Sequence, residues 1–221
     1  MKEAYYTLGT IAAQAEAFKQ GLGSLQRDGV RGYQPNRSAL LLLDMQRYFL
    51  EPSSHAYVPS AVAIIPGLRR LVKAYYALRL PIVFTRHLNT SEDAGNMSTW
   101  WRDMITSDNP LSQIAPEFEP GMGVAITKSQ YDAFHETILE ELLCGRNVSQ
   151  VVVCGVMTHL CCETTARSAF MRGFEVFFTI DGTATYNEGF HQATLLNLAH
   201  GFAKPVLVSE LLARLGVANE G

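Results

Sequence analysis

The sequence predicts a single α/β domain, in which a doubly wound, mostly parallel six-stranded sheet lies between two layers of helices. Of the 221 residues, 48% are hydrophobic and 18% are charged, a composition that excludes intrinsic disorder. Six short apolar runs are nearly continuous rather than alternating, as in strands buried on both faces. Helical patterns separate these runs, and strands that alternate with helices form right-handed βαβ units. The expected architecture is therefore a three-layer αβα sandwich.

The six expected strands are short and rich in β-branched residues. In a Rossmann-like sheet of this kind, ligands bind at the carboxyl ends of the strands, so the residues that follow each strand are the first candidates for a functional site. The strands are expected at residues 39–43, 81–85, 123–127, 150–154, 174–180 and 205–208.

Four helices are expected between the strands. Leu68, Leu71 and Tyr75 recur at spacings of three and four residues, which predicts a helix with Pro66 in its first turn. Gly145 and Gly173 are expected to end the next two helices. The second, third and fourth helices are expected at about residues 134–143, 160–172 and 188–200.

Residues 1–36 precede the first strand and differ from the rest of the chain. They contain a weak helical pattern at about residues 9–19 and a glycine-rich stretch at 21–32. We expect an N-terminal arm that packs on the core or on a neighbouring subunit, and a domain formed by residues 37–221. An apolar arm favours a homodimer or a homotetramer.

Charge and hydropathy limit the partners. The chain has 18 Lys and Arg against 21 Asp and Glu, so it has no basic excess for nucleic acid. No apolar run approaches the roughly 18–20 residues of a membrane span, and the first residues lack the apolar core of a secretory signal. The four cysteines are clustered, and the adjacent Cys161 and Cys162 fit free thiols in a reducing cytoplasm. No glycine-rich nucleotide motif occurs. We expect a cytoplasmic protein that acts on a small molecule.

Two charged residues follow expected strands. Asp44 comes directly after residues 39–43, where partial burial raises the pKa of a carboxyl group and suits it to proton transfer; the alternative is a helix cap. Lys128 follows residues 123–127, where it can hold a carboxylate or stabilise a thiolate; the alternative is a solvated strand end.

Cys161 lies six residues after Gly155, in the expected first turn of a helix that begins near His159. The helix dipole and the free N–H groups of that turn favour a thiolate, whereas the alternative is a small buried hydrophobic residue. We interpret Cys144, Cys154 and Cys162 as packing residues. An acid, a cation and a thiol at one sheet edge together indicate an activated nucleophile.

Further residues are candidates for substrate binding. Arg86 can fork onto a carboxylate or a carbonyl, with a surface ion pair as the alternative. Trp100 and Trp101 are expected in a pocket wall or a subunit contact. The remaining candidates for lining or supporting the pocket are Gln46, Phe49, His87, Tyr131, Thr158 and His159, although core packing is the favoured reading of Phe49.

With these motifs in order, the sequence resembles the isochorismatase-like cysteine hydrolases from Ser38 to Leu215. That superfamily includes nicotinamidases, N-carbamoylsarcosine amidases, biuret and ureidoacrylate amidohydrolases, and isochorismatase. The resemblance is carried by Asp-Met-Gln at residues 44–46, by Lys128 followed by Phe134, by Gly-Val-x-Thr-x-x-Cys at 155–161, by Glu-Thr-Thr-Ala-Arg-Ser-Ala-Phe-Met-Arg-Gly-Phe at 163–174, and by Asp-Gly-Thr-Ala-Thr at 181–185.

The resemblance implies a catalytic triad of Asp44, Lys128 and Cys161. It also implies a non-proline cis peptide between Val156 and Met157, with the backbone N–H groups of Met157 and Cys161 forming an oxyanion hole. The family tendency agrees with a homodimer or a homotetramer.

The sequence departs from two branches of this family. Nicotinamidases carry an Asp-x-His pair and a further histidine that hold a metal, but here the corresponding stretch has only His87, and the six histidines show no ligand spacing. We therefore expect neither a metal nor another cofactor. Isochorismatases usually have a small residue at the nucleophile position. Cys161 thus favours thiol chemistry, while His159, shared with the isochorismatase-type turn, keeps that activity open.

Three functional hypotheses follow. The first is a cofactor-free cysteine hydrolase that cleaves a C–N bond of a small amide, carbamoyl or ureido compound through a Cys161 thioester, with Asp44 and Lys128. The second is a vinyl-ether hydrolase of the isochorismatase type that uses Asp44 as general acid. The third is a non-catalytic assembly module that retains the fold.

Overall fold

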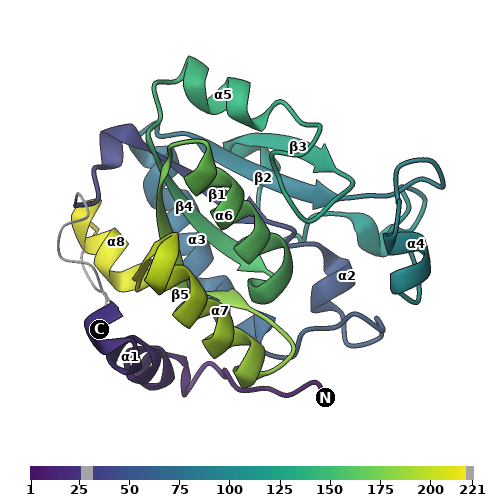
Figure 1. The fold of residues 1–221 in the computed structure, drawn as a ribbon, viewed down its shortest axis with the longest axis horizontal. Helices are drawn as coiled ribbons and strands as arrows, with labels where there is room; N and C mark the ends of the chain where they lie inside the picture. Colours follow the sequence, from purple (N-terminus) through teal and green to yellow (C-terminus); the bar gives the residue numbers. More distant parts are fainter. Residues whose placement is uncertain (26–31, 218–221) are drawn as a thin grey trace.

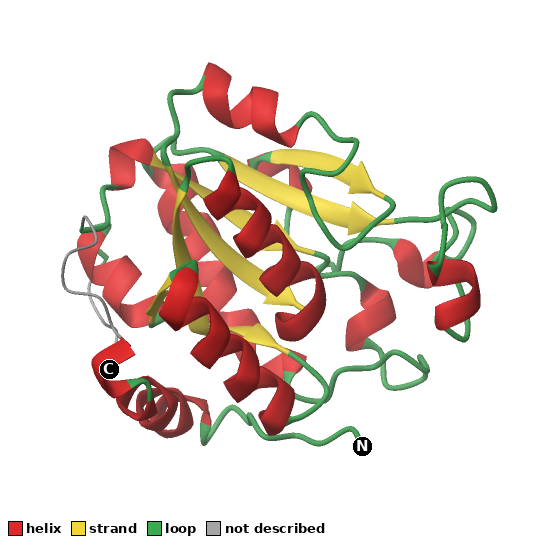
Figure 2. Ribbon diagram, in the orientation of Figure 1, coloured by secondary structure: helices red, strands yellow, loops and turns green. Residues whose placement is uncertain are grey.

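The computed structural model describes residues 1–25 and 32–217 and contains one six-stranded sheet with helices on both faces (Figures 1 and 2). The strand order is β3-β2-β1-β4-β5-β6, and every neighbouring pair is parallel. This confirms the predicted α/β class, with a sheet that is parallel throughout. The strands are β1 (Ser38–Leu43), β2 (Ile82–His87), β3 (Val124–Lys128), β4 (Gln150–Val156), β5 (Glu175–Ala184) and β6 (Lys204–Val206).

Side chains of β1 alternate between two apolar cores. Leu40 and Leu42 pack with the helices at residues 61–77 and 208–214 on one face, whereas Leu41 and Leu43 pack with the helices at 139–145, 163–171 and 188–201 on the other. This explains why the run Ser38–Leu43 is buried along its whole length. The helices are α1 (Ile11–Gly21), α2 (Arg47–Leu50), α3 (Ala61–Ala77), α4 (Met97–Trp100), α5 (Leu139–Gly145), α6 (Glu163–Met171), α7 (Glu188–Gly201) and α8 (Val208–Arg214).

Short helical turns join several of these elements. A π-helical turn, η5 (Thr158–Cys162), lies between β4 and α6. The 3₁₀ turns are η1 (Gly23–Leu25), η2 (Pro35–Arg37), η3 (Pro110–Ser112) and η4 (Pro120–Met122). Within the described ranges, no helix is both long and apolar enough to cross a membrane.

Two predicted helix starts are wrong. α3 begins at Ala61, so Pro66 lies inside the helix rather than in its first turn; the buried side chains of Ala61 and Ile64 extend the helix despite the hydrogen bond that proline cannot donate. The helix expected from residue 134 begins only at Leu139. The Asp132 carboxylate accepts the N–H of Phe134, which forms a local turn that competes with a helix.

The expected N-terminal helix is α1, and it begins two residues later than predicted. Part of the glycine-rich stretch, residues 26–31, lies outside the described residues. The segment before α1, residues 1–8, runs along the carboxyl-end side of β5 toward α1, and Tyr5 and Tyr6 are buried. In the described part of the arm, these side chains pack on the core of their own chain.

Candidate active site

A cleft opens at the carboxyl ends of β1, β2 and β4. The cleft and the open solvent at its mouth together have a volume of about 600 Å³. Cys161 and His87 lie in its floor, and its walls come from α2, the loop around α4, the segment after β3, the turn after β4 and the loop after β5. Most wall residues are aromatic or sulfur-containing: Tyr48, Phe49, Met97, Trp101, Met104, Tyr131, Met157 and Tyr186.

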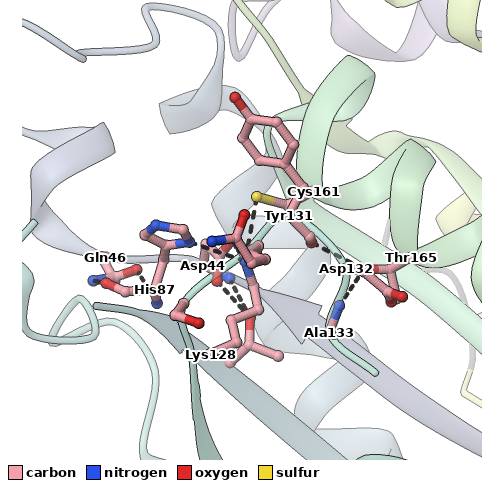
Figure 3. Close-up of polar contacts among 12 residues, drawn as sticks. Asp44, Gln46, His87, Lys128, Tyr131, Asp132, Ala133, Cys161 and Thr165 are labelled. Carbon is pink, nitrogen blue, oxygen red and sulfur yellow. Dashed lines mark hydrogen bonds and ion pairs between the residues drawn. The ribbon is translucent and has the colours of Figure 1, made fainter. Parts of the chain in front are cut away.

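Lys128 lies at the centre of the reactive side chains under this floor (Figure 3). Its Nζ is 2.8 Å from Asp44 Oδ2 and 3.4 Å from Cys161 Sγ. It is also 3.3 Å from His87 Nδ1 and donates to the carbonyl of Gln130 at 2.9 Å. Asp44 and Lys128 are inaccessible to solvent, and Cys161 is 6% exposed. The structure thus brings together the acid, the cation and the thiol that follow three separate strands.

Thr85 holds the carboxylate of Asp44, and sequence reasoning missed it. The Asp44 N–H donates to Thr85 Oγ1 at 3.0 Å, and that hydroxyl donates to Asp44 Oδ1 at 2.6 Å. Asp44 has a φ of 50°, a left-handed conformation that aspartate tolerates better than most residues. Successive strand residues face opposite sides, so Thr85 and His87 both face the site, and this signal was present in the sequence.

The ion pair determines the protonation state of the floor. Burial favours the neutral form of both partners, but Lys128 holds the pKa of Asp44 below its usual value, and Asp44 holds the pKa of Lys128 above its own. Burial raises the pKa of Cys161 to about 12 and lowers that of His87 to about 4. At neutral pH the floor therefore presents a thiol and a neutral imidazole, with a carboxylate and an ammonium directly beneath them.

Two sequence-based expectations about ionisation are corrected by this arrangement. We expected burial to raise the pKa of Asp44. Burial is the largest single effect, but Lys128, His87 and the hydrogen bonds to Cys161 and Lys128 together outweigh it and lower this pKa. We expected a helix terminus to favour the thiolate of Cys161, but the buried thiol lies beside the negative charge of Asp44, and both effects favour the neutral form. The sulfur therefore requires a base when it attacks.

The turn after β4 differs from the expected helix start. The peptide between Val156 and Met157 is cis. The Met157 carbonyl then accepts the N–H groups of Leu160 at 3.0 Å and of Cys162 at 3.2 Å, where an α-helix would use that of Cys161. α6 begins only at Glu163, so Cys161 lies in the preceding π-helical turn and not in the first turn of the long helix.

Gly155 brings this turn close to β1. Its φ is 111°, and a Cβ at this position would lie 2.1 Å from the carbonyl oxygen of Leu43. Only glycine combines that conformation with such a close approach. The contact places the exit of β4 directly beside Asp44, the residue after Leu43.

Four of the predicted substrate-binding residues line the cleft. Phe49, His87, Trp101 and Tyr131 are all in its walls or floor. Trp101 Nε1 donates to the hydroxyl of Tyr131 at 2.6 Å, which fixes two aromatic walls against each other. Phe49 lines the cleft and also packs in the core, so both interpretations of this residue apply.

Two predicted residues support the cleft without lining it. Arg86 faces the opposite side of β2 from His87, and its guanidinium donates to the carbonyl and hydroxyl of Ser112. Among the described residues, its partner is Ser112 and not an acidic side chain. Gln46 is fully buried, donates to the carbonyls of His87 and Ser112, and accepts the N–H of His87.

Three other predicted residues also lie outside the cleft lining. Trp100 is 78% exposed, because α4 turns it away from Trp101. Thr158 contacts His191 Nδ1, and His159 stacks on Phe190 with ring centroids 4.3 Å apart. The π-helical turn directs both side chains toward the α7 side.

Several lining residues were missed because they belong to loops without a periodic pattern. Asn89 accepts a hydrogen bond from His87 Nε2 at 2.8 Å, which leaves His87 Nδ1 as the acceptor that faces Lys128. The other lining residues that sequence reasoning missed are Tyr48, His55, Ala56, Met97, Asp103, Met104, Ile105, Leu160 and Tyr186.

The floor does not fit a metal ion. Asp44, His87 and Cys161 offer three ligand atoms within 4.8 Å of one another. The ammonium of Lys128 contacts all three of these side chains, and a second cation bound to them would lie beside this positive charge. The site that three such ligands would create is already taken by Lys128.

The remaining cysteines differ from one another. Cys154 and Cys162 are buried, as expected of packing residues. Cys144 is exposed, so that part of the prediction is wrong. It follows the inward-facing Leu143 in α5, and consecutive helical residues point in different directions.

Comparisons with known proteins agree with the fold. A family model described as the isochorismatase domain matches residues 38–210. Nicotinamidase 3 of Arabidopsis thaliana is 41% identical over 171 residues, which cover 75% of this chain and 82% of that protein. Enterobactin synthase component B of Escherichia coli K12 is 28% identical over 185 residues, which cover 81% of this chain and 64% of that protein.

A solved structure gives the same result. The cysteine hydrolase from Pseudomonas syringae pv. phaseolicola 1448A has a TM-score of 0.81 and 26% identity, and the match covers 85% of this chain and 96% of that one. Together with the family model and the relatives, this shows that the chain belongs to the family of isochorismatase-like hydrolases.

Proposed function

We propose that the protein is a cofactor-free cysteine hydrolase that cleaves a C–N bond of a small neutral amide, carbamoyl or ureido compound. The observation that carries the proposal is the position of Cys161 Sγ, in the floor of the cleft and 3.4 Å from Lys128, which in turn pairs with Asp44. The similarity to a protein named nicotinamidase, a hydrolase of an amide, supports the same chemistry.

In the proposed acylation step, Asp44 accepts the thiol proton while sulfur attacks the carbonyl carbon. Asp44 is the base because its pKa is low enough to keep it ionised and its carboxylate lies beside the Cys161 thiol as well as beside Lys128. A C–S bond forms, and the carbonyl electrons move to oxygen. When the C–N bond breaks, the proton on Asp44 passes to the departing nitrogen, and a thioester remains. Water, deprotonated by Asp44, then hydrolyses the thioester and regenerates the thiol.

Lys128 and the turn after β4 stabilise the charges of this reaction. The ammonium compensates the negative charge as it moves between Asp44 and sulfur. The N–H groups of Met157 and Cys161 are the proposed oxyanion hole. The π-helical pattern supports this role, because the Met157 carbonyl takes the N–H of Cys162 and leaves that of Cys161 to the cleft.

The cleft lining favours a flat, uncharged substrate. Its walls include Tyr48, Phe49, Trp101, Tyr131 and Tyr186, and among the described residues that line it there is no lysine or arginine. Arg86, the predicted carboxylate partner, is held by Ser112 instead. Isochorismate carries two carboxylates, so this lining favours an amide over the vinyl-ether alternative.

Ammonia release over a panel of small amides and ureas, with isochorismate as a further substrate, tests the proposal. We expect turnover of an uncharged amide, its loss in Cys161→Ala, and its retention in Cys162→Ala, which removes the neighbouring buried thiol. Iodoacetamide is expected to inactivate the enzyme in step with alkylation of the peptide that contains Cys161; peptide mapping separates this from reaction at the exposed Cys144. Isochorismate turnover that survives Cys161→Ala would contradict the proposal.

A further inference from the structure

The N-terminal segment, residues 1–8, lies outside the matched family domain of residues 38–210 but reaches the back of the candidate active site. Tyr5 and Tyr6 are 6% and 1% exposed. They pack around His191 of α7, with ring centroids 5.3 Å and 5.4 Å from the imidazole. A terminal segment that buries two tyrosines in this way is part of the core rather than a loose extension.

Hydrogen bonds determine which nitrogen of His191 carries the proton. Tyr6 donates its hydroxyl hydrogen to the carbonyl of Ile180 at 3.2 Å, so toward His191 Nε2, 3.3 Å away, it acts as the acceptor. Nε2 therefore carries the hydrogen, and Nδ1 is an acceptor. Burial lowers the pKa of His191 to about 3, so the ring is neutral.

Two hydroxyl groups lie within hydrogen-bond distance of this acceptor. Tyr5 lies 3.0 Å from His191 Nδ1 and accepts the N–H of Thr185 at 3.0 Å. Thr158 lies 3.1 Å from the same Nδ1. Thr158 is the first residue of the π-helical turn and follows Met157 directly. The Tyr5 hydroxyl thus belongs to the small buried network that holds the first residue of this turn.

The same segment contacts the walls of the cleft. The N–H of Glu3 donates to the carbonyl of Tyr186 at 2.8 Å, and the ammonium of Lys2 lies 4.5 Å from the centre of the Tyr186 ring. Lys2 also donates to the carbonyl of His55. Tyr186 and His55 lie on separate loops that both line the cleft. Residues 2–6 therefore connect the back of the turn to two cleft walls.

We propose that Tyr5 is a positioning residue: through His191 and Thr158 it holds the Met157–Cys161 turn in the geometry that binds the oxyanion. This inference rests on the proposed function, because it assigns Tyr5 to the oxyanion hole of that reaction. Tyr5 is not among the residues that line the cleft, and its hydroxyl contacts His191 and Thr185 rather than the triad, so we expect its effect to be confined to steps that build negative charge on oxygen.

Tyr5→Phe tests the inference, with Tyr33→Phe as the matched control. Tyr33 has a partly buried hydroxyl that bonds to Tyr75 at 2.7 Å, in a network that involves no residue of the turn. Loss of one oxyanion donor typically costs about 10²–10³ in rate, so a donor that is displaced but present should cost about tenfold. We expect Tyr5→Phe to lower kcat about tenfold with KM nearly unchanged, and Tyr33→Phe to retain the wild-type kcat.

Alkylation separates the oxyanion hole from the triad. Displacement of iodide from iodoacetamide by sulfur forms no oxyanion. We therefore expect iodoacetamide to alkylate Cys161 in Tyr5→Phe at the wild-type rate. Amide hydrogen exchange gives a readout that needs no substrate: exchange in the peptide covering residues 157–161 should be faster in Tyr5→Phe than in Tyr33→Phe. Thr158→Val should reproduce the kcat loss, and the double variant with Tyr5→Phe should be little worse than either single variant.

Unchanged kcat together with unchanged exchange in Tyr5→Phe would overturn the inference, as would an equal loss of kcat and of alkylation rate, which would indicate damage to the triad. A wild-type enzyme that releases no ammonia from any amide contradicts the proposed function instead. In that case, the exchange comparison still decides whether Tyr5 holds the turn.

Discussion

Thr85 and Asp44 exchange two hydrogen bonds, one from the Asp44 backbone to the threonine hydroxyl and one from that hydroxyl to the Asp44 carboxylate. The pair joins the ends of β1 and β2. Because the hydroxyl donates to Oδ1, the other oxygen, Oδ2, is directed toward Lys128, 2.8 Å away. The orientation of the proposed base is thus determined by a residue of the neighbouring strand.

Thr85→Val removes the hydroxyl at nearly constant shape. A hydrogen bond to a charged group contributes about 1.5–3 kcal/mol, and one pKa unit corresponds to about 1.4 kcal/mol. We therefore expect the pKa of Asp44 to rise by about 1–2 units, which shifts the acid limb of the kcat/KM profile to higher pH by the same amount. Thr85→Ser should keep the wild-type profile. An unchanged acid limb in Thr85→Val would contradict this role.

The buried Lys128–Asp44 pair makes a prediction for stability. Lys128→Met leaves a buried carboxylate unpaired, which typically costs about 3–5 kcal/mol. The double variant Asp44→Asn/Lys128→Met removes both charges, so we expect it to be more stable than Lys128→Met alone. Urea denaturation of the wild type, Asp44→Asn, Lys128→Met and the double variant measures the coupling energy between the two charges. If the losses in free energy of unfolding of the two single variants simply add up in the double variant, the two charges are not paired in the wild type.

The pH dependence of kcat/KM should show a broad plateau. Asp44 must be ionised, and its lowered pKa keeps it so until the pH falls well into the acid range. His87 is neutral above its pKa of about 4, and Cys161 is a thiol below its pKa of about 12. With an amide that does not titrate, we expect constant kcat/KM between about pH 5 and about pH 9. A limb near pH 7 would indicate a thiolate–imidazolium pair instead.

Gly155→Ala tests the contact between β4 and β1. Gly173 is the matched control, because it also has a positive φ, of 87°, but its added Cβ would meet nothing within 4 Å. Both variants carry the cost of a left-handed alanine, about 1–2 kcal/mol. We expect Gly155→Ala to lose about 1–3 kcal/mol more through the clash with Leu43. If thermal unfolding shows the same loss in free energy of unfolding for both variants, β1 moves to accommodate the added Cβ and the close contact is not required.

The sequence predicts the sheet and its reactive edge well, for a physical reason. Continuous apolar runs such as Ser38–Leu43 indicate parallel strands, and the carboxyl ends of parallel strands meet at one edge. Asp44, Lys128 and Cys161 therefore could be placed near one another without coordinates. Thr85 could have been found as well, because it shares the strand face of His87.

The remaining features depend on contacts between distant segments. The pKa of Asp44 is lowered by Lys128 and the other groups around it, and that of Cys161 is raised by burial and by Asp44, which no local pattern reports. The walls from Trp101 and Tyr186 belong to irregular loops. The contact of Tyr5 with His191 joins residues 186 positions apart. A weak helical pattern in the arm predicts α1 but says nothing about the segment before it.

The central claim is a covalent bond between substrate and Cys161. Acid quenching during steady-state turnover of an amide, followed by mass spectrometry of the proteolytic peptides, measures it most directly. We predict an added mass equal to the acyl group on the peptide that contains Cys161, and no such mass in Cys161→Ala. The modified fraction should rise with a hindered amide whose thioester is hydrolysed more slowly. Full turnover with an unmodified Cys161, and with wild-type rates in Cys161→Ala, would contradict the account.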